Sequence, residues 1–208
     1  MIFEELFERY PVLSVCREDI LEADAIIRNC YQKGGKLLIC GNGGSCADAC
    51  HIVGELMKGF LRKRPLTQEK KAEMLSRFPV SDDLLNCLQG ALPAIALSDA
   101  DALTTAFNND VNPLYTYAQQ VYALSCPNDV LVGISTSGNA KNVACAVSVA
   151  KGLGLRTIGL TGNTGGYLKK NCDTAICVPE KETFKIQELH LPVYHALCAS
   201  AEDCFCPE

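Results

Sequence analysis

The stretch ICGNGGSCADACHIVGEL, residues 39–56, joins an apolar run to a helical pattern through a glycine-rich turn. Gly41, Gly43 and Gly44 allow the backbone to adopt positive φ and to approach a ligand closely. Ser45 comes next, where its hydroxyl can cap the helix and face the same ligand. Since a helix N-terminus offers free N–H groups and a partial positive charge, this turn predicts an anion-binding site. A tight turn between strand and helix, without a ligand, is the alternative.

Composition places the chain among globular proteins. Its 208 residues suffice for one domain with a sizeable core, and 48% of them are hydrophobic and 21% charged. No apolar run reaches the roughly 18 residues of a membrane span, and the N-terminus lacks the basic start of a secretory signal. The net charge is −5, and the one basic run, LRKRP at 61–65, fits a solvated loop. We therefore expect a cytoplasmic protein that binds neither membranes nor nucleic acids.

The thirteen cysteines form no recognisable disulfide or zinc pattern. Their number is odd and their positions are scattered, which argues against a disulfide framework. The sequence contains no CxxC pair, since residues 46–50 form CxxxC and residues 204–206 form CxC. Reduced thiols of a cytosolic protein are the simpler interpretation.

Apolar runs and helical patterns alternate along the chain. Strands with their following turns are expected at 37–40, 91–99, 129–139, 156–166 and 174–179. Helices are expected at 3–32 with a break at Pro11, at 45–60, 101–122 and 141–152, and from residue 185 onward. Nearly continuous apolar strands separated by helices indicate a parallel sheet covered on both faces. The predicted fold class is α/β, a three-layer doubly wound parallel sheet with flanking helices, which binds ligands beyond the carboxyl ends of its strands.

The polar segment 61–93 interrupts this alternation. It contains TQEKKAEMLSRF, which can form a surface helix, and it offers no candidate core strand. We interpret it as an insertion or a lid. Together with an N-terminal helical segment, residues 1–32, it belongs to a single expected domain that spans residues 1–208.

A second hydroxyl-rich turn, STSGN at residues 135–139, ends another expected strand. It supplies Ser135, Thr136 and Ser137 next to a glycine and again opens a helix. Hydroxyls and backbone donors of the two turns are expected to converge on one small volume, which predicts a phosphate cradle without a lysine. Neither GxxxxGK[ST] nor GxGxxG is present, so nucleotide cofactors are disfavoured. A third glycine turn, at residues 162–166, is interpreted as a loop.

Four motifs, GNGGSCADACH, GISTSGNAKNV, GLTGNTGG and IQELHLPVYH, together resemble the sugar isomerase (SIS) domain, in particular the phosphoheptose isomerase family. The resemblance covers about residues 1–60 and 94–203, with the motifs in the family's order. It implies a flavodoxin-like fold and a ketose–aldose isomerase that converts sedoheptulose 7-phosphate to D-glycero-D-manno-heptose 7-phosphate. The residues that it places around the sugar phosphate are Asn42, Gly43, Gly44, Ser45, Asp99, Ser135, Thr136, Ser137, Asn139 and Gln187.

The resemblance also implies one divalent metal ion per active site, Zn²⁺ or a similar ion, with His51, Glu55, Gln187 and His195 as candidate ligands. His51 and Glu55 stand four residues apart on an expected helix and therefore project from one face. Gln187 and His195 are eight residues apart, about 12 Å along a straight helix. One ion reaches both only with extended side chains, a kink or two subunits, and Pro192 between them makes a bend available.

The expected reaction is a proton transfer between adjacent carbons through an enediol, which requires a base and an acid. The resemblance makes Glu55 the base and His195 the acid, and metal ligation by Glu55 would compete with its role as base. Two positions depart from the family's pattern. Ala140 follows Asn139 where the family has a serine, and Phe184 stands where an acidic residue is common. Both departures leave the exact sugar open.

A different class of function is the alternative. A non-catalytic SIS protein could bind a sugar phosphate as a sensor, or act as an assembly factor that binds a replication initiator. The presence of all four candidate ligands favours the enzyme. The resemblance further implies a homotetramer with sites built between subunits. His190, the remaining histidine, is expected to have a structural role or to lie at the edge of the pocket.

Overall fold

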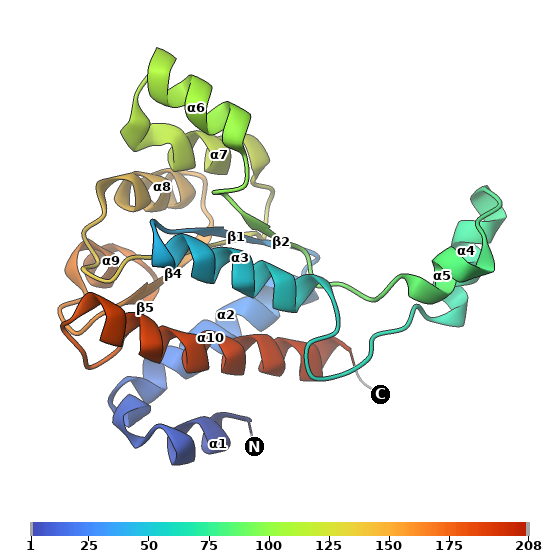
Figure 1. Ribbon diagram of the computed structural model, residues 1–208, viewed down its shortest axis with the longest axis horizontal. Coiled ribbons are helices and arrows are strands. Elements are labelled where there is room, and N and C mark those ends of the chain that lie inside the picture. Colours follow the sequence, from blue (N-terminus) through green and yellow to red (C-terminus); the bar gives the residue numbers. More distant parts are fainter. Residues whose placement is uncertain (1, 207–208) are drawn as a thin grey trace.

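A computed structural model describes residues 2–206, which contain one parallel sheet of five strands (Figure 1). The strands are β1 Leu37–Cys40, β2 Ala94–Ala96, β3 Val130–Ile134, β4 Arg156–Thr161 and β5 Thr174–Cys177. Their order is β2-β1-β3-β4-β5, and every neighbouring pair is parallel. This is the order of flavodoxin-like doubly wound sheets, so the predicted fold class is confirmed.

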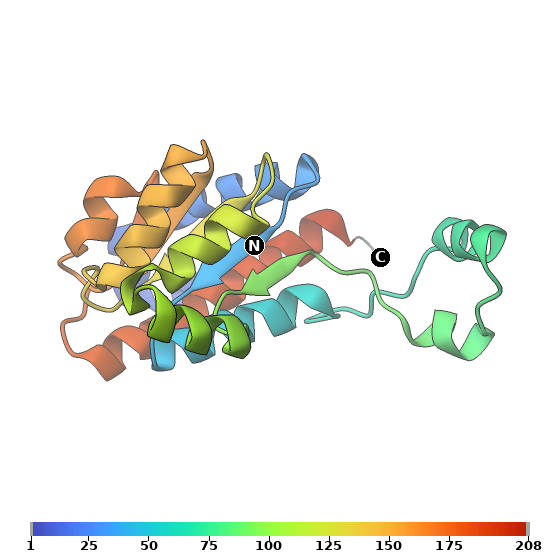
Figure 2. The ribbon, with the colours of Figure 1, turned by 90° about the horizontal axis from the view of Figure 1, so that it is seen from above.

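Helices cover both faces of the sheet and give three layers (Figures 1 and 2). Leu37, Ile39 and Val132 face one core, whereas Leu38 and Leu131 face the other. This alternation follows from the two-residue period of a strand. The layer over the first core contains α1 Ile2–Arg9, η1 Pro11–Cys16, α2 Arg17–Gln32, α3 Gly44–Met57 and α10 Thr183–Phe205, and the layer over the second contains α7 Thr116–Leu124, α8 Lys141–Gly152 and α9 Gly166–Asn171.

Most predicted helices are confirmed, and the exceptions have local causes. The N-terminal helix breaks at Pro11 as expected. The single helix expected over 101–122 is wrong, because the chain forms α6 Asp101–Asp110, η2 Pro113–Tyr115 and then α7. Pro113 has no N–H and therefore cannot donate the hydrogen bond that would continue α6. The Asn112 side chain accepts a hydrogen bond from Leu114 N at 2.9 Å and so starts η2. α3 ends at Met57 rather than near residue 60, and the turn at 162–166 opens the short helix α9.

Within the expected segment 61–93, the chain between Pro65 and Gln89 leaves the body of the molecule as an arm, whereas Arg64 and Leu92 at its two ends are buried (Figures 1 and 2). The arm contains α4 Gln68–Arg77, which is the predicted surface helix, and α5 Asp82–Cys87. Thr67 caps α4 by accepting from Lys70 N at 3.2 Å, and none of the ten described residues of α4 is buried. A β-bridge between Pro65 and Gln89 joins the two limbs of the arm at its root. The arm starts beyond the C-terminal end of α3, whereas the glycine turn lies at the N-terminal end of that helix.

Within residues 2–206, no helix combines the length and the hydropathy that crossing a membrane requires. All thirteen cysteines are free thiols in the same part of the chain. Burial raises the pKa of Cys40 and of Cys198, so these two thiols stay protonated and inert at neutral pH.

Candidate active site

The glycine turn after β1 forms one wall of the site. Gly43 is the N-cap residue of α3 and has a φ of 57°, a conformation that favours glycine. The prediction that Ser45 caps this helix is wrong, because α3 already begins at Gly44 and Ser45 lies buried in its first turn. Among the described residues no side chain caps α3. The partial positive charge of the helix end therefore acts without a competing side-chain acceptor.

The second turn, which follows β3, is held by its own side chains. Ser137 Oγ accepts from Asn139 N at 3.2 Å, and Asn139 Nδ2 donates to Ser137 O at 3.0 Å. Ser135 is buried, and its Oγ accepts from Ala140 N at 3.4 Å. Thr136 lies between the two serines in the same turn. These contacts hold three hydroxyl-bearing residues in one rigid loop, to which Ala140 contributes an N–H but no hydroxyl.

The two turns lie side by side, as expected from the carboxyl ends of the neighbouring strands β1 and β3. Asn42 and Asn142 join them by a reciprocal amide pair, with N···O distances of 2.9 and 2.8 Å. Tyr117, on α7, also holds the glycine turn, since its hydroxyl donates to Gly41 O at 2.6 Å. Sequence reasoning found Asn42 but missed Asn142 and Tyr117, because nothing in their local pattern points to partners 100 and 76 residues away.

Asp99 reaches the same region from the chain after β2. Its Oδ1 accepts from Cys50 Sγ at 3.3 Å and from Ser98 Oγ at 3.4 Å. Cys50 precedes His51 on α3, so Asp99 lies beside the middle of that helix. The carboxylate that was predicted to contact the sugar therefore lies beside Cys50, the residue before His51.

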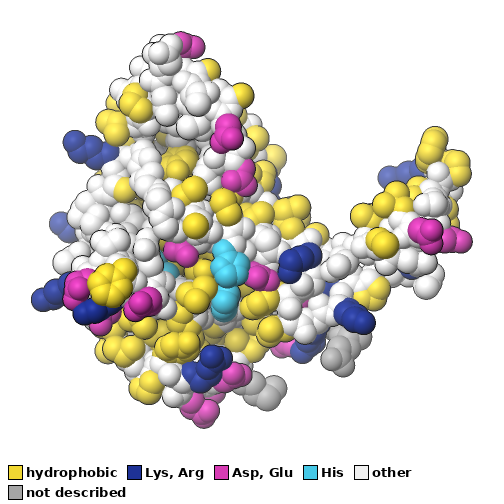
Figure 3. Space-filling view, in the orientation of Figure 1, with side chains coloured by type: hydrophobic (Ala, Val, Ile, Leu, Met, Phe, Trp, Pro, Cys, Tyr) yellow, Lys and Arg dark blue, Asp and Glu magenta, His cyan; other side chains and the backbone are white. Residues whose placement is uncertain are grey.

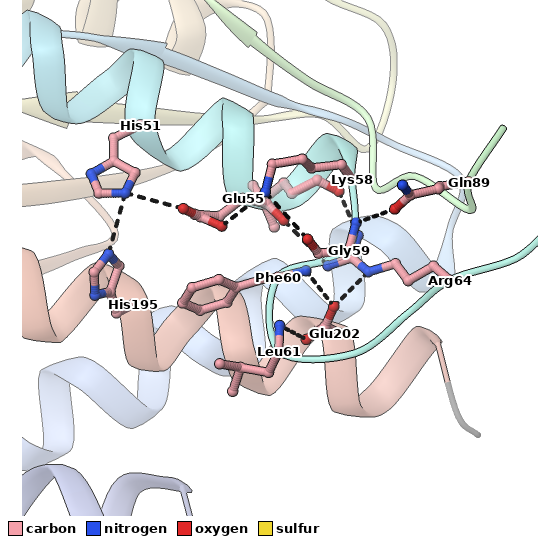
Figure 4. Close-up of polar contacts among 11 residues, drawn as sticks. His51, Glu55, Lys58, Gly59, Phe60, Leu61, Arg64, Gln89, His195 and Glu202 are labelled. Carbon is pink, nitrogen blue, oxygen red and sulfur yellow. Dashed lines mark hydrogen bonds and ion pairs between the residues drawn. The ribbon is translucent and has the colours of Figure 1, made fainter. Parts of the chain in front are cut away.

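His51, Glu55 and His195 form a compact cluster between α3 and α10 (Figure 4). His51 Nε2 lies 3.1 Å from Glu55 Oε1 and 3.4 Å from His195 Nε2. The histidines lie near the centre of one face of the molecule (Figure 3), where His51 is exposed and the other two residues are half-buried. Burial, and next the neighbouring His51, lower the pKa of His195, whereas Glu55 raises it. His195 is therefore held mainly as a neutral imidazole at pH 7.

Tyr194 orients this cluster by contacting Nδ1 of His51, the ring nitrogen that does not face Glu55. Its hydroxyl lies 3.0 Å from His51 Nδ1 and donates to Asp48 Oδ1 at 3.3 Å. Burial raises the pKa of both Asp48 and Tyr194, so the tyrosine remains a neutral donor and acceptor. Contacts of this kind fix the ring orientation of a metal-binding histidine. Sequence reasoning missed Asp48 and Tyr194, although Asp48 stands one helical turn before His51 and Tyr194 directly precedes His195.

Gln187 lies at the other end of α3 from Glu55. Its side-chain amide packs against Gly44, where any Cβ would collide with it. The helix α10 continues through Pro192 from Gln187 to His195 without interruption. In the structure Gln187 therefore lines the glycine turn, and its part in metal binding stays a prediction. His190, on the same helix, is completely buried, and burial lowers its pKa to about 4, which fits the expected structural role.

Comparison with known proteins identifies the family. Two models of the SIS domain match the chain, over residues 102–200 and over residues 11–81. A phosphoheptose isomerase of Roseiflexus sp. is 39% identical over 192 residues, which cover 92% of this chain and 81% of that protein. The chain belongs to the phosphoheptose isomerase family of SIS-domain proteins.

Solved structures of this family agree with the fold described above. The phosphoheptose isomerase of Francisella tularensis superposes with a TM-score of 0.76 at 30% identity, covering 97% of this chain and 94% of that one. The phosphoheptose isomerase of Neisseria gonorrhoeae gives a TM-score of 0.72 at 32% identity, covering 95% and 93%. The resemblance predicted from the four motifs is confirmed, and the match extends over nearly the whole length of the relatives.

The cluster of His51, Glu55 and His195 has the chemistry of a divalent metal site. Each residue offers one ligand atom, and these atoms lie within 4.8 Å of one another. Two imidazole nitrogens and one carboxylate oxygen suit Zn²⁺, and three protein ligands leave a position open for a substrate oxygen. Tyr194 supplies the orienting contact that such a histidine needs. The donor set therefore fits the ion that the family implies.

Proposed function

We propose that this chain isomerises sedoheptulose 7-phosphate to an aldoheptose 7-phosphate, D-glycero-D-manno-heptose 7-phosphate. The observation that carries the proposal is the cluster of Glu55, His51 and His195 at α3, the helix whose N-terminal end adjoins the two joined polar turns. Family membership supports the same activity, because the relatives are named phosphoheptose isomerases. A sensor or an assembly factor that binds a replication initiator would not require this cluster.

The two turns hold the phosphate in this proposal. Ser45, Ser135, Thr136 and Ser137 offer hydroxyls, and the N-terminus of α3 offers its partial positive charge. In the same proposal, Asp99 accepts a hydrogen bond from a sugar hydroxyl. The remaining residues of the binding wall are Asn42, Gly43, Gly44, Asn139 and Gln187. A phosphate fixed at one end of α3 directs the opposite end of an extended heptose along that helix toward Glu55.

Glu55 and His195 move the protons in this proposal. Glu55 takes a proton from the carbon next to the carbonyl, and the enediol then receives a proton on the adjacent carbon. His195, a neutral imidazole at pH 7, donates a proton to the original carbonyl oxygen and takes one from the neighbouring hydroxyl, which becomes the new carbonyl. Glu55 returns its proton to the original carbonyl carbon. His51 lies between the two groups, at 3.1 Å from Glu55 and 3.4 Å from His195, and fixes their relative positions.

His51, Glu55 and His195 would hold the divalent ion, with Gln187 as a further candidate. When bound, a Zn²⁺ or similar ion supplies polarisation of the carbonyl oxygen, which makes the neighbouring C–H more acidic. Ligation lowers the basicity of a carboxylate, so ligation and proton abstraction by Glu55 compete. In the structure one Glu55 oxygen faces His51, while the other lies 3.8 Å from Lys58 Nζ.

We further propose that the chain forms one SIS domain and assembles as a cytoplasmic homotetramer with active sites at subunit interfaces. The exposed apolar side chains of the arm, Leu75, Phe78 and Leu84, support burial against another copy. The free cysteines support a reducing compartment. The substrate in this proposal is a small sugar phosphate, with no nucleic acid or membrane as partner.

Incubation of the purified protein with sedoheptulose 7-phosphate tests the activity. NMR follows the appearance of the aldose with Zn²⁺ and after removal of metal by a chelator. We expect conversion in the presence of metal and slower conversion after chelation. Binding of the sugar phosphate without conversion, under every divalent metal tried, would instead support the sensor.

A further inference from the structure

The proposed base, Glu55, lies in the last turn of α3, where a helix needs help to keep its shape. α3 ends at Met57, and Lys58 is already extended, with φ −138° and ψ 174°. The last carbonyl groups of a helix have no partner within the helix and fray unless another group binds them. Glu55 O and Leu56 O belong to this set. The position of the Glu55 carboxylate therefore depends on what binds these carbonyls.

Arg64, at the root of the arm, binds both carbonyls. Its Nη1 donates to Leu56 O at 2.7 Å, and its Nη2 donates to Glu55 O at 3.2 Å (Figure 4). The guanidinium side chain is only 1% exposed. A buried cation at a helix C-terminus binds the free carbonyls and also interacts favourably with the negative end of the helix dipole.

Glu202, on α10, holds Arg64 in place. Arg64 Nε donates to Glu202 Oε1 at 2.7 Å, and the Glu202 side chain is also 1% exposed. Phe60 N and Leu61 N donate to the same carboxylate at 2.9 and 2.8 Å. Burial raises the pKa of Glu202, but these backbone donors and Arg64 outweigh it and lower the pKa below its usual range. The carboxylate is therefore charged at neutral pH, and both of its oxygens accept hydrogen bonds.

Resting on the proposed function, we propose that the Arg64–Glu202 pair is a positioning device that sets the Glu55 carboxylate against His51 and His195. The pair joins three segments that the chain brings together from far apart: the last turn of α3, the root of the arm and the C-terminal part of α10, which also carries His195. Arg64 and Glu202 touch no substrate. They act by fixing the distance between the two elements that supply the base and the acid.

A second buried carboxylate offers a matched structural control. Asp129 Oδ1 accepts from Lys36 N at 2.9 Å, and its Oδ2 accepts from Cys126 N at 2.7 Å and pairs with Lys36 Nζ. Like Glu202, it binds two backbone N–H groups and one cation, with 1% of its side chain exposed. Asp129 directly precedes β3, at the opposite edge of the sheet from both hydroxyl-rich turns. Loss of its charge destabilises the fold without touching α3.

The test compares Glu202→Gln with Asp129→Asn, and adds Arg64→Lys, which keeps the charge but loses the fork that binds two carbonyls. Steady-state kinetics with sedoheptulose 7-phosphate, at a temperature where circular dichroism shows each variant folded, separates the roles. We expect Glu202→Gln and Arg64→Lys to lower kcat by about tenfold to a hundredfold with KM changed less than about threefold, since small misplacements of a base have effects of this size. Asp129→Asn should keep kcat within about twofold. Equal losses of kcat in Asp129→Asn and Glu202→Gln would overturn the proposal.

Hydrogen exchange separates this inference from the activity itself. In Arg64→Lys we expect amides of residues 56–61 to exchange at least about tenfold faster, while those of residues 46–50 keep their wild-type rates. Unchanged exchange over 56–61 would overturn the positioning role even if the wild-type protein is an active isomerase. If the wild-type protein converts no sugar, the proposed function fails, whereas the exchange result still decides whether Arg64 holds the last turn of α3.

Discussion

The two ends of α3 are built in different ways. At the N-terminal end, Gly43 and Ser45 lie shortly after β1, and the positive φ of Gly43 shapes the turn, which Asn142 and Tyr117 then hold in place. At the C-terminal end, Glu55 depends on Arg64 and Glu202, which join segments 138 residues apart. In the proposed function, the first end binds the phosphate at a turn shaped by Gly43, and the second end places the base through long-range packing. Binding and catalysis should therefore respond differently to substitutions at the two ends.

The largest effect is expected from Glu55→Gln at the C-terminal end. The amide cannot take a proton from carbon, so we expect kcat to fall by about a thousandfold or more, as for loss of a general base. Binding of the sugar phosphate, measured by calorimetry, should change little because the cradle lies at the other end of the helix. Glu69→Gln on the arm is the matched control. A rate within about tenfold of the wild type would remove Glu55 from the mechanism.

An intermediate effect is expected from Tyr194→Phe, which removes the hydroxyl beside His51. Loss of an orienting partner of a metal-binding histidine weakens metal affinity about tenfold to a hundredfold. Titration with Co²⁺, followed by its visible spectrum, measures this change. Tyr122→Phe serves as the control because Tyr122 is largely exposed on the opposite layer. Unaltered Co²⁺ affinity would show that the cluster needs no support from Tyr194.

A smaller effect is expected from Ser45→Ala at the N-terminal end. A hydrogen bond to a charged phosphate contributes about 1.5 kcal/mol at the lower end of its range, so KM should rise by about tenfold. Because the bond is made equally in the ground and transition states, kcat should stay within about twofold. Ser76→Ala on the arm controls for the substitution itself. A fall in kcat with unchanged KM would contradict the assignment of binding to the N-terminal end of α3 and catalysis to its C-terminal end.

The smallest effect concerns the pH dependence of stability. The pKa of Glu202 is lower in the folded protein than in the unfolded chain, where it is about 4.3. The charged carboxylate therefore adds to the free energy of unfolding above this unfolded pKa, and that stabilisation is lost as the pH falls through the folded pKa. As the pH falls from 5 to 3, we expect the Tm of the wild type to fall by a few degrees more than that of Glu202→Gln, on the order of 4 °C. Parallel Tm curves for the two proteins would contradict a charged Glu202.

The same contrast explains how much the sequence predicts. The five strands and the order of the layers follow from short apolar runs, and the glycine and hydroxyl turns are recognisable because their residues are contiguous. The helix expected over 101–122 and the Ser45 cap were wrong at the level of a few residues, where Pro113 and Gly43 control the local backbone. Arg64 and Glu202 escaped prediction because each looks like an ordinary charged residue until folding brings them together. The same holds for Tyr194, whose partner His51 lies 143 residues away.

The bridge between Pro65 and Gln89 brings the two ends of the intervening segment into contact. A segment whose ends meet forms a closed loop, so its length can change without displacing the residues on either side. Replacing residues 66–88 should therefore leave the body of the subunit in place while removing the apolar side chains that are proposed to pack against another copy. A short linker, a fluorescent reporter or an affinity tag could be grafted there while the backbone hydrogen bonds that end at Arg64 and Gly90 stay in register.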